Sequence, residues 1–271
     1  MKINLCVYSD QKFEPARKAL VHLAERSECF EQIFEYDRNW LESTPFYSAN
    51  NEILDDRAKG DGWCLWKPYV IMESLEKTNS DDVVLYMDST DTFVPTIKKF
   101  LENYFTNKDV LVSQMGENPN YKYCKRDAFV KMGCDSHKFW TSVQLEAGIT
   151  AVKNNQVGRD FIGEYLQWCQ DPIVIKDSPN SLGLANFPGY VRHMYDQAVL
   201  TILKEKHGLV PSRDIRYFVE CNMWECLKFW ENGQHEFNRK VHRVCNDLLG
   251  NKKLECQFWQ ENYLLKLNPD A

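Results

Sequence analysis

Residues 83–94 read VVLYMDSTDTFV, and this stretch decides the fold that we expect for the chain. Its first five residues are β-branched, aliphatic or aromatic and follow the acidic pair Asp81-Asp82, which predicts a buried parallel strand. In an open α/β sheet, ligands bind beyond the carboxyl ends of the strands. Asp88 and Asp91 come directly after the strand, so we expect both carboxylates at such a binding edge.

Two carboxylates with this spacing suit Mg²⁺ or Mn²⁺, which prefer oxygen ligands and leave positions open for substrate phosphates. The pattern Asp-x-x-Asp is nevertheless short and common. In the alternative interpretation, Asp88 and Asp91 only cap the turn after the strand. Spacing alone does not separate a metal site from a capped turn.

Strand and helix patterns alternate through the first half of the chain, on both sides of residues 83–87. Alternation of this kind predicts a parallel sheet covered by helices. We expect further strands at Ile3–Tyr8, Gln32–Tyr36 and Val110–Ser113, and helices at Glu14–Ala24, Lys67–Lys77 and Thr96–Phe105.

The second half of the chain follows a different pattern. A predicted strand at Gln144–Lys153 is interrupted by Gly148, and residues 171–189, rich in Pro, Asn, Ser and Gly, predict a long irregular loop. No repeat, low-complexity tract or linker divides the chain, so we expect one domain with an elaborated C-terminal part. Its predicted helices are Arg126–Met132, Arg159–Cys169 and Tyr195–Lys206.

Composition narrows the possible classes of protein. The formal net charge of −6 disfavours general nucleic-acid binding, although it allows a local basic pocket. No signal peptide precedes the first predicted strand, and no apolar run approaches the ~18 residues of a membrane span, so we expect a cytoplasmic protein. The ten cysteines include no Cys-x-x-Cys pair, and we interpret them as structural thiols.

Lys67 stands at the predicted start of a helix, directly after Trp66 and close to Trp63. A helix N-terminus is itself positive, so a lysine there is favourable where both face an anion such as a phosphate. The alternative is a solvent-exposed lysine beside two packing tryptophans. The segment alone leaves both interpretations open.

Carboxylates and histidines of the second half supply further candidates. Glu146 is a lone carboxylate in an apolar run, and since glutamate is rarely buried without a partner, we interpret it as serving a substrate. Asp196, followed by Gln197, opens a helix, where an aspartate is ordinarily a cap. His242 lies in a basic stretch of the C-terminal tail, where it is either a surface residue or the completion of a site made of two carboxylates.

Taken together, five segments in this order resemble a family of small GT-A glycosyltransferases. The resemblance covers roughly residues 1 to 215 and leaves the C-terminal part unmatched. More distantly, the chain is similar to the glycogenin and galactosyltransferase group, although Glu146 replaces an asparagine of that group and its Asp-x-Asp is Asp-x-x-Asp here. The five segments are Trp63–Tyr69, Tyr86–Asp91, Lys125-Arg126-Asp127, Glu146-Ala147-Gly148 and His193–Gln197.

The resemblance implies a single GT-A domain over residues 1–271, with a mixed, mostly parallel sheet flanked by helices. Residues 1–115 would form the nucleotide-binding half, and residues 116–271 the acceptor-binding and sugar-binding half. The implied activity is hexosyl or pentosyl transfer from a nucleoside diphosphate sugar, for which we expect a UDP-linked donor, to a hydroxyl of a glycan or glycoconjugate.

The resemblance also implies roles for single residues. Mn²⁺ or Mg²⁺ would bridge the donor diphosphate, and one sugar-side carboxylate would deprotonate the acceptor if the anomeric centre is inverted. The implied donor-binding residues are Tyr8, Ser9, Asp37, Lys67 and Gln197, the metal ligands are Asp88, Asp91 and His242, and the catalytic residues are Glu146 and Asp196.

Two other classes compete with this interpretation. A metal-dependent phosphohydrolase or nucleotidyltransferase could use the same acidic pair, but an aspartate-nucleophile hydrolase would carry Asp-x-Asp after its first strand. A non-catalytic carbohydrate-binding protein could use the many tryptophans. That class leaves Asp88, Glu146 and Asp196 without a role.

Overall fold

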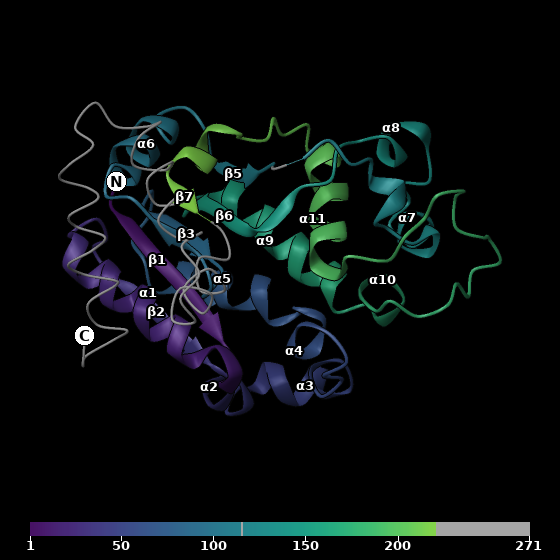
Figure 1. The fold of residues 1–271 in the computed structure, drawn as a ribbon, viewed down its shortest axis with the longest axis horizontal. Helices are drawn as coiled ribbons and strands as arrows, with labels where there is room; N and C mark the ends of the chain where they lie inside the picture. Colours follow the sequence, from purple (N-terminus) through teal and green to yellow (C-terminus); the bar gives the residue numbers. More distant parts are fainter. Residues whose placement is uncertain (115, 221–271) are drawn as a thin grey trace, which may run out of the picture.

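A five-stranded sheet lies at the centre of the part of the chain that this computed structural model describes, residues 1–114 and 116–220 (Figure 1). Its strand order is β2-β1-β3-β6-β5. The predicted strand at residues 83–87 is the central strand of the five and is fully buried. The strands are β1 (Ile3–Ser9), β2 (Ile33–Asp37), β3 (Val83–Met87), β5 (Val110–Ser113) and β6 (Glu146–Lys153).

The sheet is mixed and mostly parallel, as the resemblance implied. Strand β1 pairs in parallel with β2 and β3, whereas β6 runs antiparallel between β3 and β5. Because β6 is reversed, its first residues lie at the edge where the other four strands end. Glu146 and Gly148 therefore lie at the same edge as Ser9, Asp37 and Asp88.

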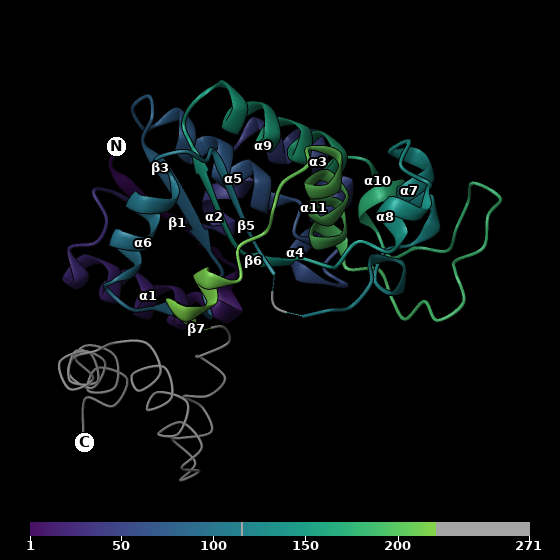
Figure 2. The same ribbon diagram turned by 90° about the horizontal axis from the view of Figure 1, so that it is seen from above.

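Helices cover both faces of the sheet (Figure 2). On one face, α1 (Glu14–Ser27) and α6 (Ile97–Tyr104) pack against the apolar side chains of β1, β3, β5 and β6. On the other face lie α5 (Trp66–Glu76), α9 (Gln156–Cys169) and α11 (Tyr195–Lys206). Strands buried on both faces explain why residues 83–87 are apolar without alternation.

Short helices that the sequence analysis did not predict fill the segment between β2 and α5. Helix α2 (Arg38–Glu42) begins where the Asp37 carboxylate accepts a hydrogen bond from the Trp40 N–H, at 2.8 Å. Helix α3 (Pro45–Leu54) begins after Thr44, whose hydroxyl accepts one from the Tyr47 N–H, at 3.1 Å. Both caps are ordinary helix-start signals.

The predicted loop at residues 171–189 begins with a short helix, α10 (Pro172–Ile175), which Asp171 caps. The loop beyond it extends away from the sheet (Figure 1). It is nevertheless anchored, because the Asp127 carboxylate accepts hydrogen bonds from the N–H groups of Ser181, at 2.6 Å, and Leu182, at 3.2 Å. The remaining strands and α-helices are β4 (Thr92–Phe93), β7 (Val219–Glu220), α4 (Gly60–Trp63), α7 (Arg126–Lys131) and α8 (His137–Trp140).

Two further features concern the class of protein. Within residues 1–114 and 116–220, no helix has both the length and the apolar character that a membrane span requires. The six cysteines in this part of the chain are free thiols, and all but Cys64 are buried.

Candidate active site

The candidate site lies where β1, β2 and β3 end and β6 begins. The backbone joins these strands closely, since the N–H of Asp88 donates to the carbonyl of Gly148 at 2.9 Å. Three clefts open along this edge, and we name each for a neighbouring strand. The β6 cleft, of about 480 Å³, is lined by residues that include Asp88, Asp91, Glu146, Arg192 and Gln197.

The β1 cleft and the β2 cleft continue the β6 cleft toward the other end of the sheet. The β1 cleft, of about 470 Å³, shares Asp88 with the β6 cleft. The β2 cleft, of about 540 Å³, shares Asp10, Lys12 and Arg57 with the β1 cleft. The three clefts therefore form one trough across the ends of the strands, and Asp88 stands at one of its two junctions.

Asp88 and Asp91 converge on Gly148. A Cβ atom placed on Gly148 would lie 3.0 Å from Asp88 Oδ2 and 3.4 Å from Asp91 Oδ2. Glycine at this position therefore lets both carboxylates approach the same point of the β6 backbone. The other oxygen of Asp88, Oδ1, accepts a hydrogen bond from the Tyr86 hydroxyl at 2.6 Å, which fixes the orientation of the carboxylate.

Lys67 lies beneath this pair. Its side chain is 5% exposed, and its Nζ lies 3.3 Å from Asp88 Oδ1 and 3.1 Å from Asp196 Oδ2. The ammonium also donates to the carbonyl of Ala147, at 3.2 Å. Burial lowers the pKa of Lys67, but Asp196 and Asp88 outweigh burial and raise it, so the lysine stays charged. The ammonium of Lys67 thus contacts groups of the protein itself, and the sequence did not indicate these contacts.

Asp196 does not line any of the three clefts. Its side chain is 5% exposed and accepts hydrogen bonds from the Tyr165 hydroxyl, at 3.0 Å, and from Lys67. The neighbouring Gln197 does line the β6 cleft. The catalytic role predicted for Asp196 stays a prediction, and its carboxylate lies behind the cleft wall.

Glu146 lines the β6 cleft and is held in place by two side chains. It accepts hydrogen bonds from the guanidinium of Arg216, at 2.9 Å, and from the hydroxyl of Ser113, at 3.3 Å. From the sequence, we expected a substrate to be the partner of this carboxylate. In the structure, Arg216, which lies far from Glu146 in the sequence, is a partner within the chain itself.

The predicted nucleotide-side residues lie along the other two clefts. Tyr8 and Ser9 line the β1 cleft, and Asp37 lines the β2 cleft. Asp37 also caps α2, and the Ser9 hydroxyl accepts a hydrogen bond from Arg17 at 3.0 Å. Eight of the ten predicted site residues thus line one trough, whereas Asp196 does not, and His242 lies outside the described residues.

Several residues that line the trough were not singled out from the sequence. Arg57 and Asp61 line the β1 cleft, and Arg192 lines the β6 cleft. Gln144 also lines the β6 cleft, and within the described chain neither polar atom of its buried amide has a hydrogen-bond partner. In the sequence, these residues could have been found as polar residues that stand beside a glycine-containing turn or an apolar strand.

His193, the first residue of the segment His193–Gln197, has a structural environment. Its Nδ1 accepts a hydrogen bond from the Lys125 N–H, at 3.2 Å, and its Nε2 lies 2.8 Å from the carbonyl of Val174, to which it donates. Burial lowers the pKa of His193 to about 4, and the nearby Lys125 adds to the shift. The ring is therefore neutral and connects the loop after α10 to α7.

The carboxylate pair fits a metal that takes most of its ligands from substrate and water. Among the residues that the structure describes, no three His, Cys, Asp or Glu side chains gather into a metal site. Mg²⁺ usually binds through one or two protein carboxylates together with substrate phosphates. Asp88 Oδ2 and Asp91 Oδ2, which both lie beside Gly148, match that type of site.

Comparisons with known proteins identify no family. No protein-family model matches the sequence, and no curated protein matches it significantly. Among solved structures, apo mouse xyloside xylosyltransferase 1 is similar with a TM-score of 0.42 and 10% identity, over 79% of this chain and 85% of that one.

Two further solved structures are also glycosyltransferases. The bifunctional glycosyltransferase WbbM has a TM-score of 0.42 and 10% identity over 74% of this chain, which spans only 37% of the length of WbbM. The galactosyltransferase LgtC, in complex with donor and acceptor sugar analogs, has a TM-score of 0.39 and 12% identity, over 74% of this chain and 70% of that one. Because these TM-scores lie below 0.5, the matches carry no argument about function.

Proposed function

We propose that this chain is a metal-dependent glycosyltransferase of the GT-A type, which transfers a sugar from a nucleoside diphosphate donor to a hydroxyl of a glycan or glycoconjugate. One observation carries the proposal. Asp88 stands where the β1 cleft meets the β6 cleft, and its Oδ2 lies with Asp91 Oδ2 beside Gly148. A diphosphate held there would place the nucleoside in one cleft and the sugar in the other.

The polar groups of the trough support this orientation of the donor. Lys12, Arg57 and Asp10 lie where the β1 and β2 clefts meet and would offer hydrogen-bond donors and an acceptor to the neutral nucleoside. The β6 cleft offers carboxylate and amide groups of Glu146, Gln144 and Gln197, which suit sugar hydroxyls. A phosphohydrolase needs no second cleft, such as the β6 cleft, on the far side of its metal site.

Asp88 and Asp91 would hold Mn²⁺ or Mg²⁺, with His242 as the proposed third protein ligand. The bound metal would stabilise the negative charge that develops on the departing diphosphate. Lys67 fixes Asp88 from below, through Oδ1, and leaves Oδ2 directed at Gly148. In this proposal Asp196 acts through Lys67, and Glu146 is the carboxylate that meets the acceptor in the β6 cleft.

The experiment incubates the purified chain with a panel of nucleotide sugars, UDP-linked sugars first, with Mn²⁺ and with or without oligosaccharide acceptors. We expect one donor to release its nucleoside diphosphate, faster with an acceptor, and EDTA to stop the release. Asp88→Asn, which keeps the shape of the side chain, should abolish turnover and Mn²⁺-dependent nucleotide binding.

Other products would decide for the rival classes. Release of inorganic phosphate from phosphorylated sugars would indicate a phosphohydrolase, and pyrophosphate formed from a nucleoside triphosphate would indicate a nucleotidyltransferase. Glycan binding without any turnover would indicate a carbohydrate-binding protein. Each of these results contradicts the proposed transferase.

A further inference from the structure

The short element α4 is a left-handed turn, and it forms one wall of the β1 cleft. Five consecutive residues, Gly60 to Cys64, have positive φ angles between 49° and 88°. Hydrogen bonds close the turn, from the Trp63 N–H to the Lys59 carbonyl at 2.8 Å and from the Cys64 N–H to the Gly60 carbonyl at 3.1 Å. For a residue other than glycine this conformation costs roughly 1–2 kcal/mol. Strain of this kind persists at functional sites more often than elsewhere.

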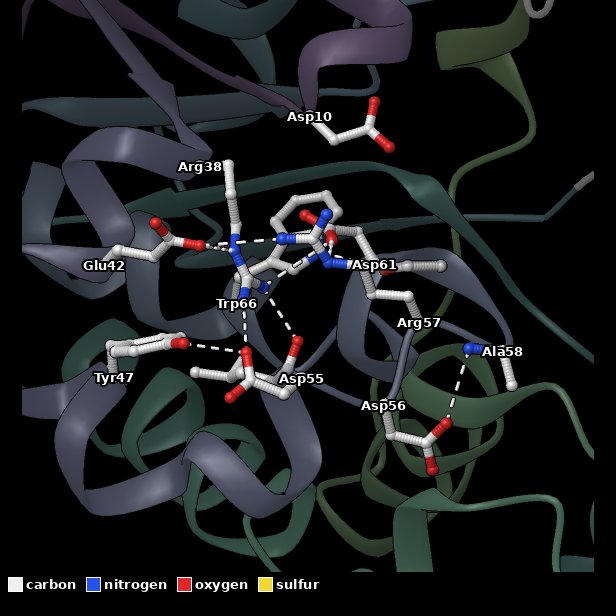
Figure 3. Close-up of polar contacts among 12 residues, drawn as sticks. Asp10, Arg38, Glu42, Tyr47, Asp55, Asp56, Arg57, Ala58, Asp61 and Trp66 are labelled. Atoms are coloured by element: carbon white, nitrogen blue, oxygen red, sulfur yellow. Dashed lines mark hydrogen bonds and ion pairs between the residues drawn. The ribbon is translucent and has the colours of Figure 1, made fainter.

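The surrounding structure holds the turn in place. A Cβ atom on Gly62 would lie 2.7 Å from the Cα of Leu54, so only glycine fits there. The Trp66 indole N–H donates to the Gly60 carbonyl at 3.0 Å, and the Trp66 ring stacks on Tyr8 with a centroid separation of 4.0 Å. The result is a fixed backbone that directs the side chain of Asp61 toward Tyr8 and the arginines shown in Figure 3.

One oxygen of Asp61 is satisfied and the other is not. The Tyr8 hydroxyl donates to Asp61 Oδ2 at 2.7 Å, and burial together with Asp61 raises the pKa of Tyr8, so the phenol keeps its proton. Asp61 Oδ1 is buried and, within the described chain, has no hydrogen-bond donor. Arg38 and Arg57 each lie 3.6 Å from it, within range of an ion pair but too long for a hydrogen bond.

The two arginines differ in how firmly they are held. Arg38 is buried and donates to Glu42, to Asp55 and to the Leu54 carbonyl, each at 2.7–2.8 Å (Figure 3). The side chain of Arg57 is 61% exposed and reaches Glu42 only at 3.5 Å. Movement of Arg57 would therefore uncover Asp61 Oδ1 at little cost, whereas Arg38 would keep the carboxylate neutralised.

We propose that Asp61 Oδ1 accepts a hydrogen bond from a ribose hydroxyl of the bound nucleotide and so selects ribonucleotides over deoxyribonucleotides, an inference that rests on the proposed function. Asp61 lines the β1 cleft, and its Oδ1 lies 3.6 Å from Arg57, which stands at the junction with the β2 cleft. In a donor whose diphosphate lies at Asp88 and which extends along the trough, the ribose occupies the β1 cleft. A carboxylate there accepts from a hydroxyl but repels a phosphate.

The experiment measures nucleotide binding by calorimetry with the full chain and Mn²⁺. UDP, GDP, ADP and CDP are compared first, and the tightest binder is then compared with its 2′-deoxy and 3′-deoxy forms. Asp61→Asn and Asp61→Gly are the test variants, because asparagine and glycine tolerate the left-handed conformation best. Asp55→Asn is the matched control, since Asp55 also contacts Arg38 but does not line the trough.

For the unmodified chain we expect at least one deoxy form to bind about tenfold more weakly than the ribonucleotide, as for a lost hydrogen bond to a charged group. The ratio should fall toward one in Asp61→Gly, fall in part in Asp61→Asn and persist in Asp55→Asn. An unchanged ratio in both Asp61 variants would overturn the ribose assignment while the proposed function stands. If no nucleoside diphosphate binds the unmodified chain, both are wrong.

Discussion

Replacing Lys67 with methionine should destabilise the protein, because it leaves a buried carboxylate without its cation. Methionine fills nearly the same volume but has neither the charge nor a hydrogen-bond donor. Lys67 Nζ lies 3.1 Å from Asp196 Oδ2 and donates to the Ala147 carbonyl at 3.2 Å. The hydroxyl of Tyr165 and the thiol of Cys64 would then remain as the described polar partners of Asp196.

The size of the effect follows from burial. Asp88 is the second carboxylate that contacts Lys67, and its side chain is 39% exposed. Because solvent screens this carboxylate, the loss of its contact with Lys67 adds little to the destabilisation. Asp196 is 5% exposed. Removing one partner of a buried pair costs about 3–5 kcal/mol of unfolding free energy, and we expect Lys67→Met to fall in that range.

Urea unfolding of four proteins measures the effect: the unmodified chain, Lys67→Met, Asp196→Asn and the double variant. In Lys67→Met, burial raises the pKa of Asp196 above its value in the unfolded chain. A raised pKa contributes stability at low pH that is lost as pH rises, so the deficit should shrink as pH falls from about 7 toward about 5. The double variant should recover part of the loss.

Lys77→Met is the matched control, because Lys77 ends the same helix and contacts the Tyr36 hydroxyl instead of a carboxylate. It should change the free energy of unfolding by about 0.5 kcal/mol or less. If Lys67→Met is as stable as the control, or if the losses of Lys67→Met and Asp196→Asn simply add in the double variant, the buried pair does not stabilise this edge of the sheet.

Three further outcomes are expected. Gly148→Ala places a Cβ 3.0 Å from Asp88 Oδ2 and should weaken Mn²⁺-dependent nucleotide binding roughly 10-fold to 100-fold, with nucleoside binding unchanged in calorimetry. Glu146→Gln should lower the transfer rate by roughly 10²–10⁴ if Glu146 is the acceptor base, while nucleoside diphosphate affinity stays the same; near-normal transfer would exclude that role. The pKa of His193 is lowered to about 4, so the free energy of unfolding should decrease as pH falls below about 6.5, by up to about 3 kcal/mol near pH 4. This part of the pH dependence should be absent from the unfolding curves of His193→Gln.

Periodicity and apolar runs were sufficient to predict the five strands of the sheet and most of the longer helices from the sequence. The predicted strand at residues 83–87 and the predicted helix at Tyr195–Lys206 have the observed bounds. Helix α9 begins at Gln156, three residues before the predicted start, because Asn155 caps it through the Gly158 N–H at 2.9 Å. Caps of this kind were available in the sequence and were not used.

The place of Asp88 at an edge of the sheet was predictable, and the pairings of the candidate residues were not. The edge location of Asp88 followed from its position directly after a predicted parallel strand, because ligands bind at the carboxyl ends of such strands. The partners of Lys67 and Glu146 could not be read from the sequence, since each contact joins residues far apart in the chain. The left-handed turn at Gly60–Cys64 was equally hidden, because its tryptophan and cysteine rarely adopt positive φ angles.

The reversed strand β6 has a consequence for any attempt to divide the chain. It is the hydrogen-bonding neighbour of both β3 and β5, although it lies in the sequence well after residue 115. A fragment made of residues 1–115 would therefore keep β3 with one edge open and would leave β5 detached from the sheet. Open apolar edges of this kind recruit strands from other molecules. We expect such a fragment to aggregate rather than to bind nucleotides, so the two halves are inseparable in folding even if they bind different parts of a substrate.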